Sequence, residues 1–375
     1  MRPTCLIAAY LLGGACACAG ASPSVETEPD RSPAIDRVLV EEHVTCVLVG
    51  GVLYCNGMPP LSVEQDAELG GFRAFPVSGV TDLACTYLHC CLGREGGNVS
   101  CWGRGYPTVF NGPPFVRFDE AVDAVGTGAQ RACALLRSGQ LGCWSVPPAA
   151  PAVPPTHVEV STPHGLREAT QLAWSGEGAC VLEREGAVMC WATRAGNGAG
   201  GAGSVPMQAY LPSSATMVVA SETHTCAIVA GAGYCWGHDE HGELGDGSAR
   251  FHEPGMADMP ERVALEAPLQ AIAPGDLFTC ALDSSGRVWC WGLNDRGQLG
   301  DGTRSPHVTP TRVARFAGAT GIVAGREHAC VWTRDEVWCW GARRFPVRER
   351  NAAGCEEDAC TTPVLAAHIR DLLDD

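Results

Sequence analysis

The sequence predicts an all-β protein, a seven-bladed β-propeller with four strands in each blade. Three observations lead to this prediction. A cysteine pair recurs seven times, and the segment inside each pair has the length and glycine content of a β-hairpin. The repeat period indicates a propeller or a solenoid, and four short strands per period are typical of a propeller blade. The 375 residues exceed the usual size of a single domain, which a repeat architecture explains.

The first 19 residues have the pattern of an export signal: one Arg, a short apolar run to Leu12, then small residues. Because a membrane-spanning helix needs roughly 20 apolar residues, this run is too short to be one. Cys16 and Cys18 are candidates for the lipidated cysteine of a bacterial lipoprotein, although neither has the preferred Leu three residues before it. The alternative is ordinary cleavage at an Ala-x-Ala site, after Ala17, Ala19 or Ala21.

The chain after the signal divides into two predicted parts. Residues 20–34, rich in Ser, Pro and Glu, are expected to form a flexible tether, and residues 35–375 the propeller. Export places the protein in the cell envelope, in the periplasm or on the outer-membrane surface, or outside the cell. Three of the 21 cysteines lie in the signal region, so 18 remain in an oxidising compartment, an even number that favours disulfides.

Seven cysteine pairs are expected to form disulfides across seven hairpins. Their members are 9 or 10 residues apart, and the second members recur at intervals of 46, 42, 47, 45, 55 and 49 residues. Zinc is disfavoured because close Cys-x-x-Cys spacings are absent from these pairs. The pairs are Cys46–Cys55, Cys91–Cys101, Cys133–Cys143, Cys180–Cys190, Cys226–Cys235, Cys280–Cys290 and Cys330–Cys339.

Glycine occupies the hairpin loops where the turn geometry requires it. A three-residue loop favours Gly at its last position. Those positions hold Gly97, Gly139, Gly186 and Gly286. A two-residue loop favours Gly second, and here stand Gly51 and Gly231, with Asp335 as the exception. This register places the cysteines on non-hydrogen-bonded pairs, whose short Cα separation suits a disulfide.

A Trp follows the second cysteine in six repeats, and Asn56 takes its place in the first. Side chains alternate along a strand, so each Trp should lie on the sheet face opposite its cysteine. We expect these Trp side chains to pack between neighbouring blades, with a sugar-binding row as the alternative. They are Trp102, Trp144, Trp191, Trp236, Trp291 and Trp340.

Two more strands are expected to complete each blade. An apolar strand precedes each hairpin, as at residues 269–275, and a fourth strand, as at 309–315, precedes that one. The tail at 362–372 resembles the opening strand of another repeat, whereas only residues 34–40 precede the first hairpin. We therefore expect the N- and C-terminal strands to share one blade, close the ring and cover each other's edges.

Several repeats resemble the regulator-of-chromosome-condensation repeat family, whose members are seven-bladed propellers. The shared pattern is His-x-Cys-Ala-Leu, a hairpin, and Trp-Gly-x-Asn-x-x-Gly-Gln-Leu-Gly-Asp-Gly-Thr. Residues 279–303 show it nearly whole, and residues 224–248 show it with Glu243 and Ser248 substituted. It is partial at 328–341 and 89–103 and weak in repeats one, three and four. The resemblance covers roughly residues 35–370, and the paired cysteines resemble those of secreted bacterial members.

Four further cysteines lie outside the hairpin pairs. The expected additional disulfides are Cys85–Cys90 and Cys355–Cys360. Cys90 could instead exchange with Cys91 as the partner of Cys101, because the two are adjacent. The acid cluster between Cys355 and Cys360 is more typical of a solvated surface loop than of a cation site.

The sequence contains no recognisable catalytic, cofactor-binding or metal-binding constellation. His89, His224 and His328 recur two residues before a hairpin cysteine, which favours a structural hydrogen bond. The turns that begin at Asp246 and Asp301 look like fragments of calcium loops but lack the other ligands.

The family resemblance, the tether and the missing catalytic residues favour a binding protein that is not an enzyme. The formal net charge of −16 argues against a nucleic-acid partner. We expect a monomer that contacts a membrane only through a lipid at its N-terminus and binds an unidentified protein partner. The insertions at residues 146–155 and 251–268 are candidate binding loops, and the sequon at Asn98 lies inside a predicted hairpin.

Two other functions are compatible with the sequence. One is a secreted enzyme inhibitor, similar to a bacterial propeller that inhibits β-lactamases. The other is a carbohydrate-binding or hydrolytic propeller. The nucleotide-exchange activity that the resemblance implies, on a small nuclear GTPase, is opposed by the export signal and the acidic charge.

Overall fold

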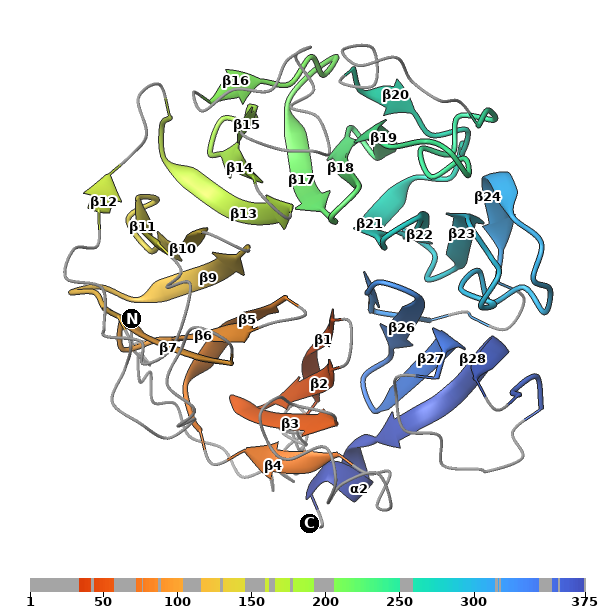
Figure 1. The fold of residues 1–375 in the computed structure, drawn as a ribbon, viewed down its shortest axis with the longest axis horizontal. Coiled ribbons are helices and arrows are strands. Elements are labelled where there is room, and N and C mark those ends of the chain that lie inside the picture. Colours follow the sequence, from red (N-terminus) through yellow and green to blue (C-terminus); the bar gives the residue numbers. More distant parts are fainter. Residues whose placement is uncertain are drawn as a thin grey trace, which may run out of the picture. The chain divides into compact units, whose positions relative to one another are not determined.

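The structure, a computed structural model, contains seven four-stranded antiparallel sheets arranged as blades around a ring (Figure 1). The predicted seven-bladed propeller is thereby confirmed. The residues it describes are 34–41, 44–56, 72–75, 77–86, 89–103, 116–128, 131–145, 159–161, 166–175, 178–191, 206–249, 259–313, 316, 318–343, 353–356 and 358–373. Within these ranges no helix is long and apolar enough to cross a bilayer.

Blades one to four come first along the chain. Blade one contains β1 (Ile35–Glu41), β2 (Val44–Val49), β3 (Val52–Asn56) and β4 (Arg73–Phe75). Blade two contains β5 (Val80–Cys85), β6 (His89–Arg94), β7 (Asn98–Gly103) and β8 (Val116–Arg117). Blade three contains β9 (Val122–Thr127), β10 (Arg131–Leu136), β11 (Leu141–Ser145) and β12 (Glu159–Ser161). Blade four contains β13 (Ala169–Ser175), β14 (Gly178–Glu183), β15 (Val188–Trp191) and β16 (Met207–Gln208).

Blades five to seven complete the ring, and a short helix follows the last strand. Blade five contains β17 (Ala215–Ala220), β18 (His224–Val229), β19 (Ala232–Gly237) and β20 (Glu261–Arg262). Blade six contains β21 (Leu269–Pro274), β22 (Phe278–Asp283), β23 (Val288–Gly292) and β24 (His307–Arg312). Blade seven contains β25 (Gly321–Ala324), β26 (His328–Trp332), β27 (Glu336–Ala342) and β28 (Ala359–His368), with α2 (Ile369–Leu373) after it.

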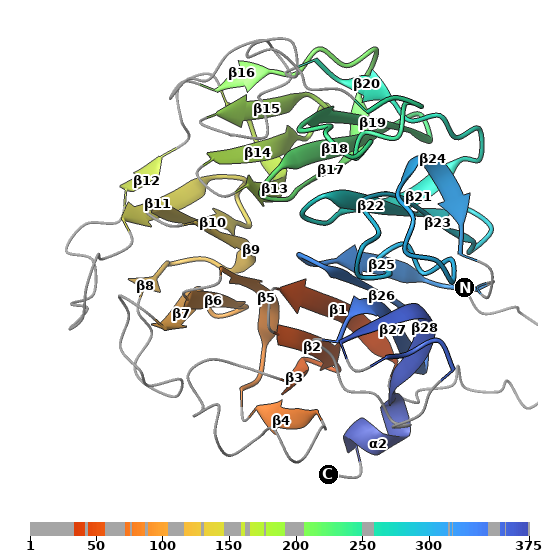
Figure 2. The same cartoon turned by 45° about the vertical axis from the view of Figure 1, so that its right-hand side comes forward.

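Each blade is built from four consecutive strands, each paired with the next in sequence. The first strand of a blade lies nearest the ring axis and the fourth lies at the outside (Figures 1 and 2). The hairpin that carries the cysteine pair supplies the second and third strands. This arrangement directs the ends of seven innermost strands toward the axis.

The expected ring closure, with N- and C-terminal strands in one blade, is wrong. β1 to β4 form blade one alone, and β28 is the outer strand of blade seven. The physical reason is the phase of the repeat. The strand at 307–312 pairs with β23 of the preceding hairpin and not with the next blade. The tail strand β28 holds the same outer position against β27, so no terminal strand remains to be shared.

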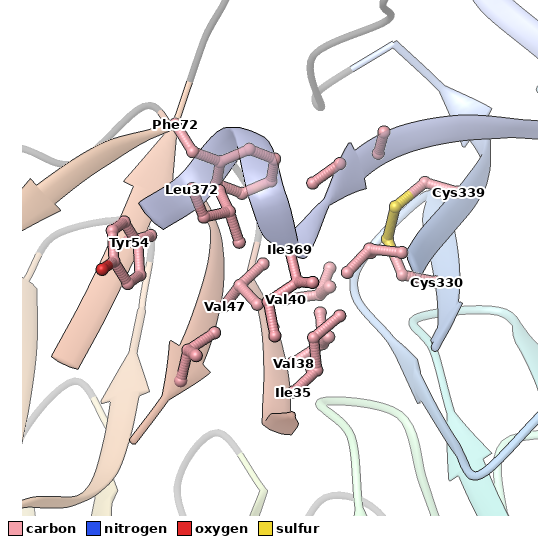
Figure 3. Close-up of a cluster of buried hydrophobic side chains, with 14 of the residues drawn as sticks. Ile35, Val38, Val40, Val47, Tyr54, Phe72, Cys330, Cys339, Ile369 and Leu372 are labelled. Atoms are coloured by element: carbon pink, nitrogen blue, oxygen red, sulfur yellow. A yellow bond between two sulfur atoms is a disulfide. The ribbon is translucent and has the colours of Figure 1, made fainter. Parts of the chain in front are cut away.

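Blades one and seven therefore meet through side chains (Figure 3). Val38 and Val40 of the innermost strand of blade one belong to one buried cluster with Val337 and Val364 of blade seven. A backbone hydrogen bond from the N–H of Ile35 to a carbonyl at the β26–β27 turn also crosses this seam (3.0 Å). The ring is thus closed by packing rather than by a common sheet.

The helix α2 supplies apolar volume at the same seam. Ile369 and Leu372 are buried in the cluster, and Figure 3 shows the helix beside Phe72 and Tyr54 of blade one. Repeat one is the repeat with Asn56 in place of the Trp. The seam consequently lacks the indole that the other blades insert at this place, and α2 contributes aliphatic side chains there.

The hydrophobic core consists of clusters between adjacent blades. The predicted packing role of the repeated Trp agrees with this arrangement, because each lies against the blade that precedes its own. Trp191 is half-buried at the contact of blades three and four. The fully buried members are Trp102, Trp144, Trp236, Trp291 and Trp340.

All nine cysteine pairs expected from the sequence are disulfides in the structure. Cys91 is bonded to Cys101 and Cys85 to Cys90, which is the first of the two pairings considered. In blade six, Cys280 and Cys290 are directly opposite, with Cα atoms 4.1 Å apart. That separation is typical of a non-hydrogen-bonded antiparallel pair, as the register predicts.

Candidate functional site

A cavity of about 160 Å³ lies on the ring axis, because residues from all seven blades line it. We call it the axial cavity; its wall consists of the carboxyl ends of the innermost strands and the turns that follow them. One residue per strand holds an equivalent position there, since each pairs with the residue directly before the first hairpin cysteine. Six of the seven are Val40, Cys85, Thr127, Ala220, Pro274 and Ala324.

The seventh equivalent residue is Trp174 of β13, the one large side chain in the set. It is half-buried. The neighbouring β9 accommodates the indole because its residue 126 is glycine: a Cβ added there would lie 2.8 Å from Trp174 Cε3. Sequence reasoning missed this residue because it lies in the weakest part of the repeat pattern. Alignment of the seven innermost strands would have shown it as an outlier.

Charged residues lie in the turns at the rim of the axial cavity. Arg326 Nε is 3.3 Å from Asp276 Oδ2, and the Asp276 N–H donates to the Arg326 carbonyl (3.3 Å). The Thr223 hydroxyl donates to the Asp276 carbonyl, so hydrogen bonds join the turns of blades five, six and seven. Glu222, by contrast, is exposed and forms no ion pair within the described part of the chain.

Polar side chains also join the innermost strands along the axis. Arg37 donates to Asp82 (2.7 Å), and the Val125 N–H donates to the other carboxylate oxygen (3.0 Å), which links blades one, two and three. Burial raises the pKa of Asp82, although Arg37 and the backbone N–H groups act in the opposite direction. In blades four and five, Gln171 Oε1 accepts from the Val218 N–H (3.0 Å).

The recurring histidines lie at blade-to-blade joints, as the structural interpretation predicts. His89 Nε2 is 2.6 Å from the hydroxyl of Thr127 in blade three, and His224 Nε2 is 2.7 Å from that of Thr279 in blade six. His328 makes the corresponding, longer contact with Thr45 across the seam between blades seven and one (3.4 Å). All three imidazoles are buried.

The joint at His224 shows the proton arrangement. The Thr279 hydroxyl donates its hydrogen to the Glu243 carbonyl (2.8 Å), so it can only accept from His224. The imidazole therefore carries its proton on Nε2. Burial lowers the pKa of His224 to about 4, a shift that Glu243 opposes, so the ring is neutral at pH 7.

The acidic loop in blade seven is held by arginines. Arg304 donates to Glu356 (2.7 Å) and Arg296 donates to Asp358 (2.9 Å), both from the glycine-rich turn of blade six. The Arg343 N–H also donates to the Asp358 carbonyl (2.9 Å). These carboxylates join two blades, which agrees with the surface-loop interpretation.

The Asp-Gly turns serve the fold. Asp301 Oδ1 accepts from the N–H and hydroxyl of Thr303 (2.8 and 2.9 Å) and from the amide of Asn294. Asp246 accepts from Ser248 in the same way. In the part of the chain that the structure describes, no group of three or more His, Cys, Asp or Glu side chains could hold a metal ion.

Several predicted features fall outside the described residues. These include both lipidation candidates, Cys16 and Cys18, the insertion at 146–155 and residues 251–258 of the one at 251–268. Asn98 is described: it is half-buried in β7 and pairs there with Arg117.

Sequence comparison places the repeats in a known group. The profile described as "Regulator of chromosome condensation (RCC1) repeat" matches residues 285–332, and a second profile of the same description matches residues 270–298. Both matches lie in blades six and seven, where the repeat pattern is most complete.

Curated relatives match part of the chain. Over 131 residues it is 36% identical to RCC1 domain-containing protein RUG3, mitochondrial, of Arabidopsis thaliana, which covers 33% of this chain and 29% of that protein. Over 116 residues it is 32% identical to the ultraviolet-B receptor UVR8 of the same plant, covering 30% and 26%. The matched segment thus spans less than a third of either relative.

Solved structures match most of the ring. Prp20p from Saccharomyces cerevisiae superimposes with a TM-score of 0.65 at 17% identity, covering 81% of this chain and 82% of that chain. Human WBSCR16 gives 0.65 at 16% identity, covering 79% and 84%. These likenesses show the fold. Fold and repeat matches together define a seven-bladed propeller that contains RCC1 repeats. Residues 270–332 carry regulator-of-chromosome-condensation (RCC1) repeats, so the resemblance to this family is confirmed.

Proposed function

We propose that this protein is an exported, lipid-anchored, non-enzymatic scaffold that engages a protein partner through its propeller loops. The axial cavity carries this proposal. Its 160 Å³ lie below the range of about 300–1,000 Å³ usual for small-molecule sites, which favours a protein ligand that also contacts the surface around this cavity. Among the described residues, two carboxylates and no histidine line the cavity, and Asp276, one of the two, is paired with Arg326.

The disulfides support export. Every cysteine after residue 34 is in one of the nine disulfides. Disulfides persist in oxidising compartments and are rare where glutathione keeps thiols reduced. With the signal at residues 1–19 and the tether at 20–34, this favours a secreted bacterial type of RCC1-repeat protein in the cell envelope.

Mass spectrometry of the mature N-terminus tests whether the protein is anchored to a membrane by a lipid. We expect a diacylglyceryl cysteine at position 16 or 18, and we expect the double substitution Cys16→Ala, Cys18→Ala to release the protein into the soluble fraction. An unmodified Ala or Ser at the start of the wild-type protein would contradict lipid anchoring and leave export intact.

Protein binding has support from a structural neighbour. Prp20p is described by its binding to Gsp1p and histones. Crosslinking in the producing cell, followed by purification under denaturing conditions, should recover one partner in stoichiometric amount. A chain that crosslinks to nothing at native abundance would contradict the scaffold role.

An inhibitor role and a carbohydrate-binding role are weaker candidates. An inhibitor would present several exposed aromatics on one face, yet Tyr210 is the single large aromatic exposed among the described residues. A sugar site would use exposed Trp rows, whereas the repeated Trp side chains are buried or half-buried.

A further inference from the structure

We propose that the axial cavity binds one cationic side chain, an Arg or Lys of the partner protein, with Trp174 and Glu222 as its contacts. This inference rests on the proposed function, because it names the face of the propeller and the chemistry that hold the partner. It follows from four features of the cavity: an aromatic residue, an uncompensated carboxylate, a small volume and a bonded rim.

Trp174 is the first feature. At the seven equivalent positions of the innermost strands, six residues are small or moderate in size, and the seventh is this indole. Five of the six repeated Trp side chains of the hairpins are buried between blades, whereas Trp174 is half-buried at the cavity wall. An indole face is the best aromatic partner of a Lys ammonium or Arg guanidinium.

Charge is the second feature. Arg326 is the one basic residue among the described residues that line the cavity, and it is paired with Asp276. Glu222, from the adjacent blade five, has no cationic partner among the described residues, so the rim carries an uncompensated negative charge. The whole chain has a net charge of −16, which also attracts cations and repels anions.

Volume and rigidity are the third and fourth features. A cavity of about 160 Å³ is too small for a typical metabolite and suits a single side chain. Part of the rim is fixed before binding, since Thr223 of blade five is hydrogen-bonded to Asp276 of blade six, and Asp276 to Arg326 of blade seven. A site fixed in this way loses little freedom when the ligand enters.

The test uses the full-length protein and blocked heptapeptides of sequence Gly-Ser-Gly-X-Gly-Ser-Gly in calorimetric titrations. X is Arg, Lys or citrulline, which has nearly the shape of Arg without its charge. We expect the Arg or the Lys peptide to bind, and the citrulline peptide to bind at least about tenfold more weakly.

Variants then locate the site. Trp174→Ala and Glu222→Gln should each weaken binding of the cationic peptide by about tenfold. Glu266→Gln is the matched control: it removes the same charge from a side chain that is 90% exposed and away from the cavity, and should change nothing. Trp174→Phe, which keeps an aromatic ring, should give an intermediate loss and serves if the alanine variant does not fold.

Three results would overturn the inference: no binding of either cationic peptide, equal binding of the citrulline peptide, or binding unchanged by Trp174→Phe and Glu222→Gln. A crosslinked partner whose affinity is the same for wild type and for these variants would also overturn it, while the scaffold function would stand. Peptide titration therefore tests the cavity inference, and partner crosslinking tests the scaffold function, so one can be contradicted without the other.

Discussion

At the scale of single residues, the contact between neighbouring blades depends on glycines, which leave room for a Trp of the next blade. Gly300, in the glycine-rich turn of blade six, lies against Trp340 of blade seven. The indole Nε1 donates to the Gln298 carbonyl of the same turn (2.8 Å). A Cβ at Gly300 would lie 2.8 Å from Trp340 ring atoms, and the residue has a φ of +65°. Gly245 makes the same contact with Trp291 one blade earlier.

Gly300→Ala should therefore destabilise the fold by about 2–4 kcal/mol, from overpacking added to left-handed backbone strain. Gly302→Ala is the matched control, because φ is also positive (+90°) but the nearest atom to the new Cβ lies 3.8 Å away. It should cost about 1–2 kcal/mol from strain alone. Guanidinium unfolding without reductant measures both. Equal losses would mean that the Trp340 contact is unimportant.

The lowered pKa of His224 leads us to expect that the fold is less stable in acid. The unfolded imidazole binds a proton below its ordinary pKa of 6.5, whereas the buried ring does so only near 4. Stability from this residue is thus complete above pH 6.5 and is lost as the pH falls toward 4, by up to about 3 kcal/mol. His224→Gln should be less stable than wild type at pH 7.5 but show a shallower decline between pH 6.5 and 4.

Urea unfolding at pH 7.5, 5.5 and 4.5 tests this prediction. Carboxylates also titrate in this range, but they are common to both proteins, so the difference between the two curves isolates the imidazole. Parallel curves for wild type and His224→Gln would contradict it.

At the scale of elements, the hairpins were the most predictable part. A 9- or 10-residue cysteine spacing together with Gly in the loop determines the turn, the register and the disulfide. Gly231 and Gly286, for example, have the positive φ that their loops require (81° and 76°). These are local constraints, and a single sequence contains them in full.

The order of strands within a blade was less predictable. The fourth strand carries little pattern of its own: β24 has half-buried and exposed residues but no buried one, and β20 has two residues. Nothing local states whether such a strand pairs with the hairpin before it or the one after it. The glycine-rich turn at Gly297–Gly302 returns the chain to its own blade, and that reversal is a property of three-dimensional packing.

Removal of one hairpin disulfide tests how far the blades depend on these bonds. Cys280→Ala with Cys290→Ala should lower the free energy of unfolding by about 2–3 kcal/mol, because the bond closes a short loop in the unfolded chain. The propeller should still form, since both positions are buried among apolar neighbours. Loss of native circular dichroism in this variant would show that the bond is needed for folding itself.

At the scale of the whole molecule, closure of the ring depends on the seam between blades one and seven. Leu372 of α2 is 4% exposed in that seam, and the adjacent Leu373 is 46% exposed. Leu372→Ala should cost about 2–5 kcal/mol, as expected for a buried leucine, whereas Leu373→Ala should change stability by less than about 0.5 kcal/mol. Thermal unfolding of the two variants gives the comparison, and equal melting temperatures would contradict a structural role for α2.

The candidate site was largely invisible in the sequence, although the ring around it was not. Trp174 and Glu222 are 48 positions apart in the chain and come together only because blades four and five are adjacent. A repeat pattern identifies what its copies share. To predict a binding site formed by differences between copies, one must know which positions face the axis. The register of the innermost strands gives those positions.

The self-contained blade has a consequence for how such a chain can change in length. Each sequence repeat, from innermost to outermost strand, coincides with one sheet, and no strand is exchanged between the first blade and the last. Tandem duplication or excision of one repeat in the gene would therefore add or remove one complete blade without changing the strand pairing of any other blade. Only the side-chain packing of the two flanking blades against their new neighbours would change. The number of blades in this architecture is therefore open to change by single recombination events.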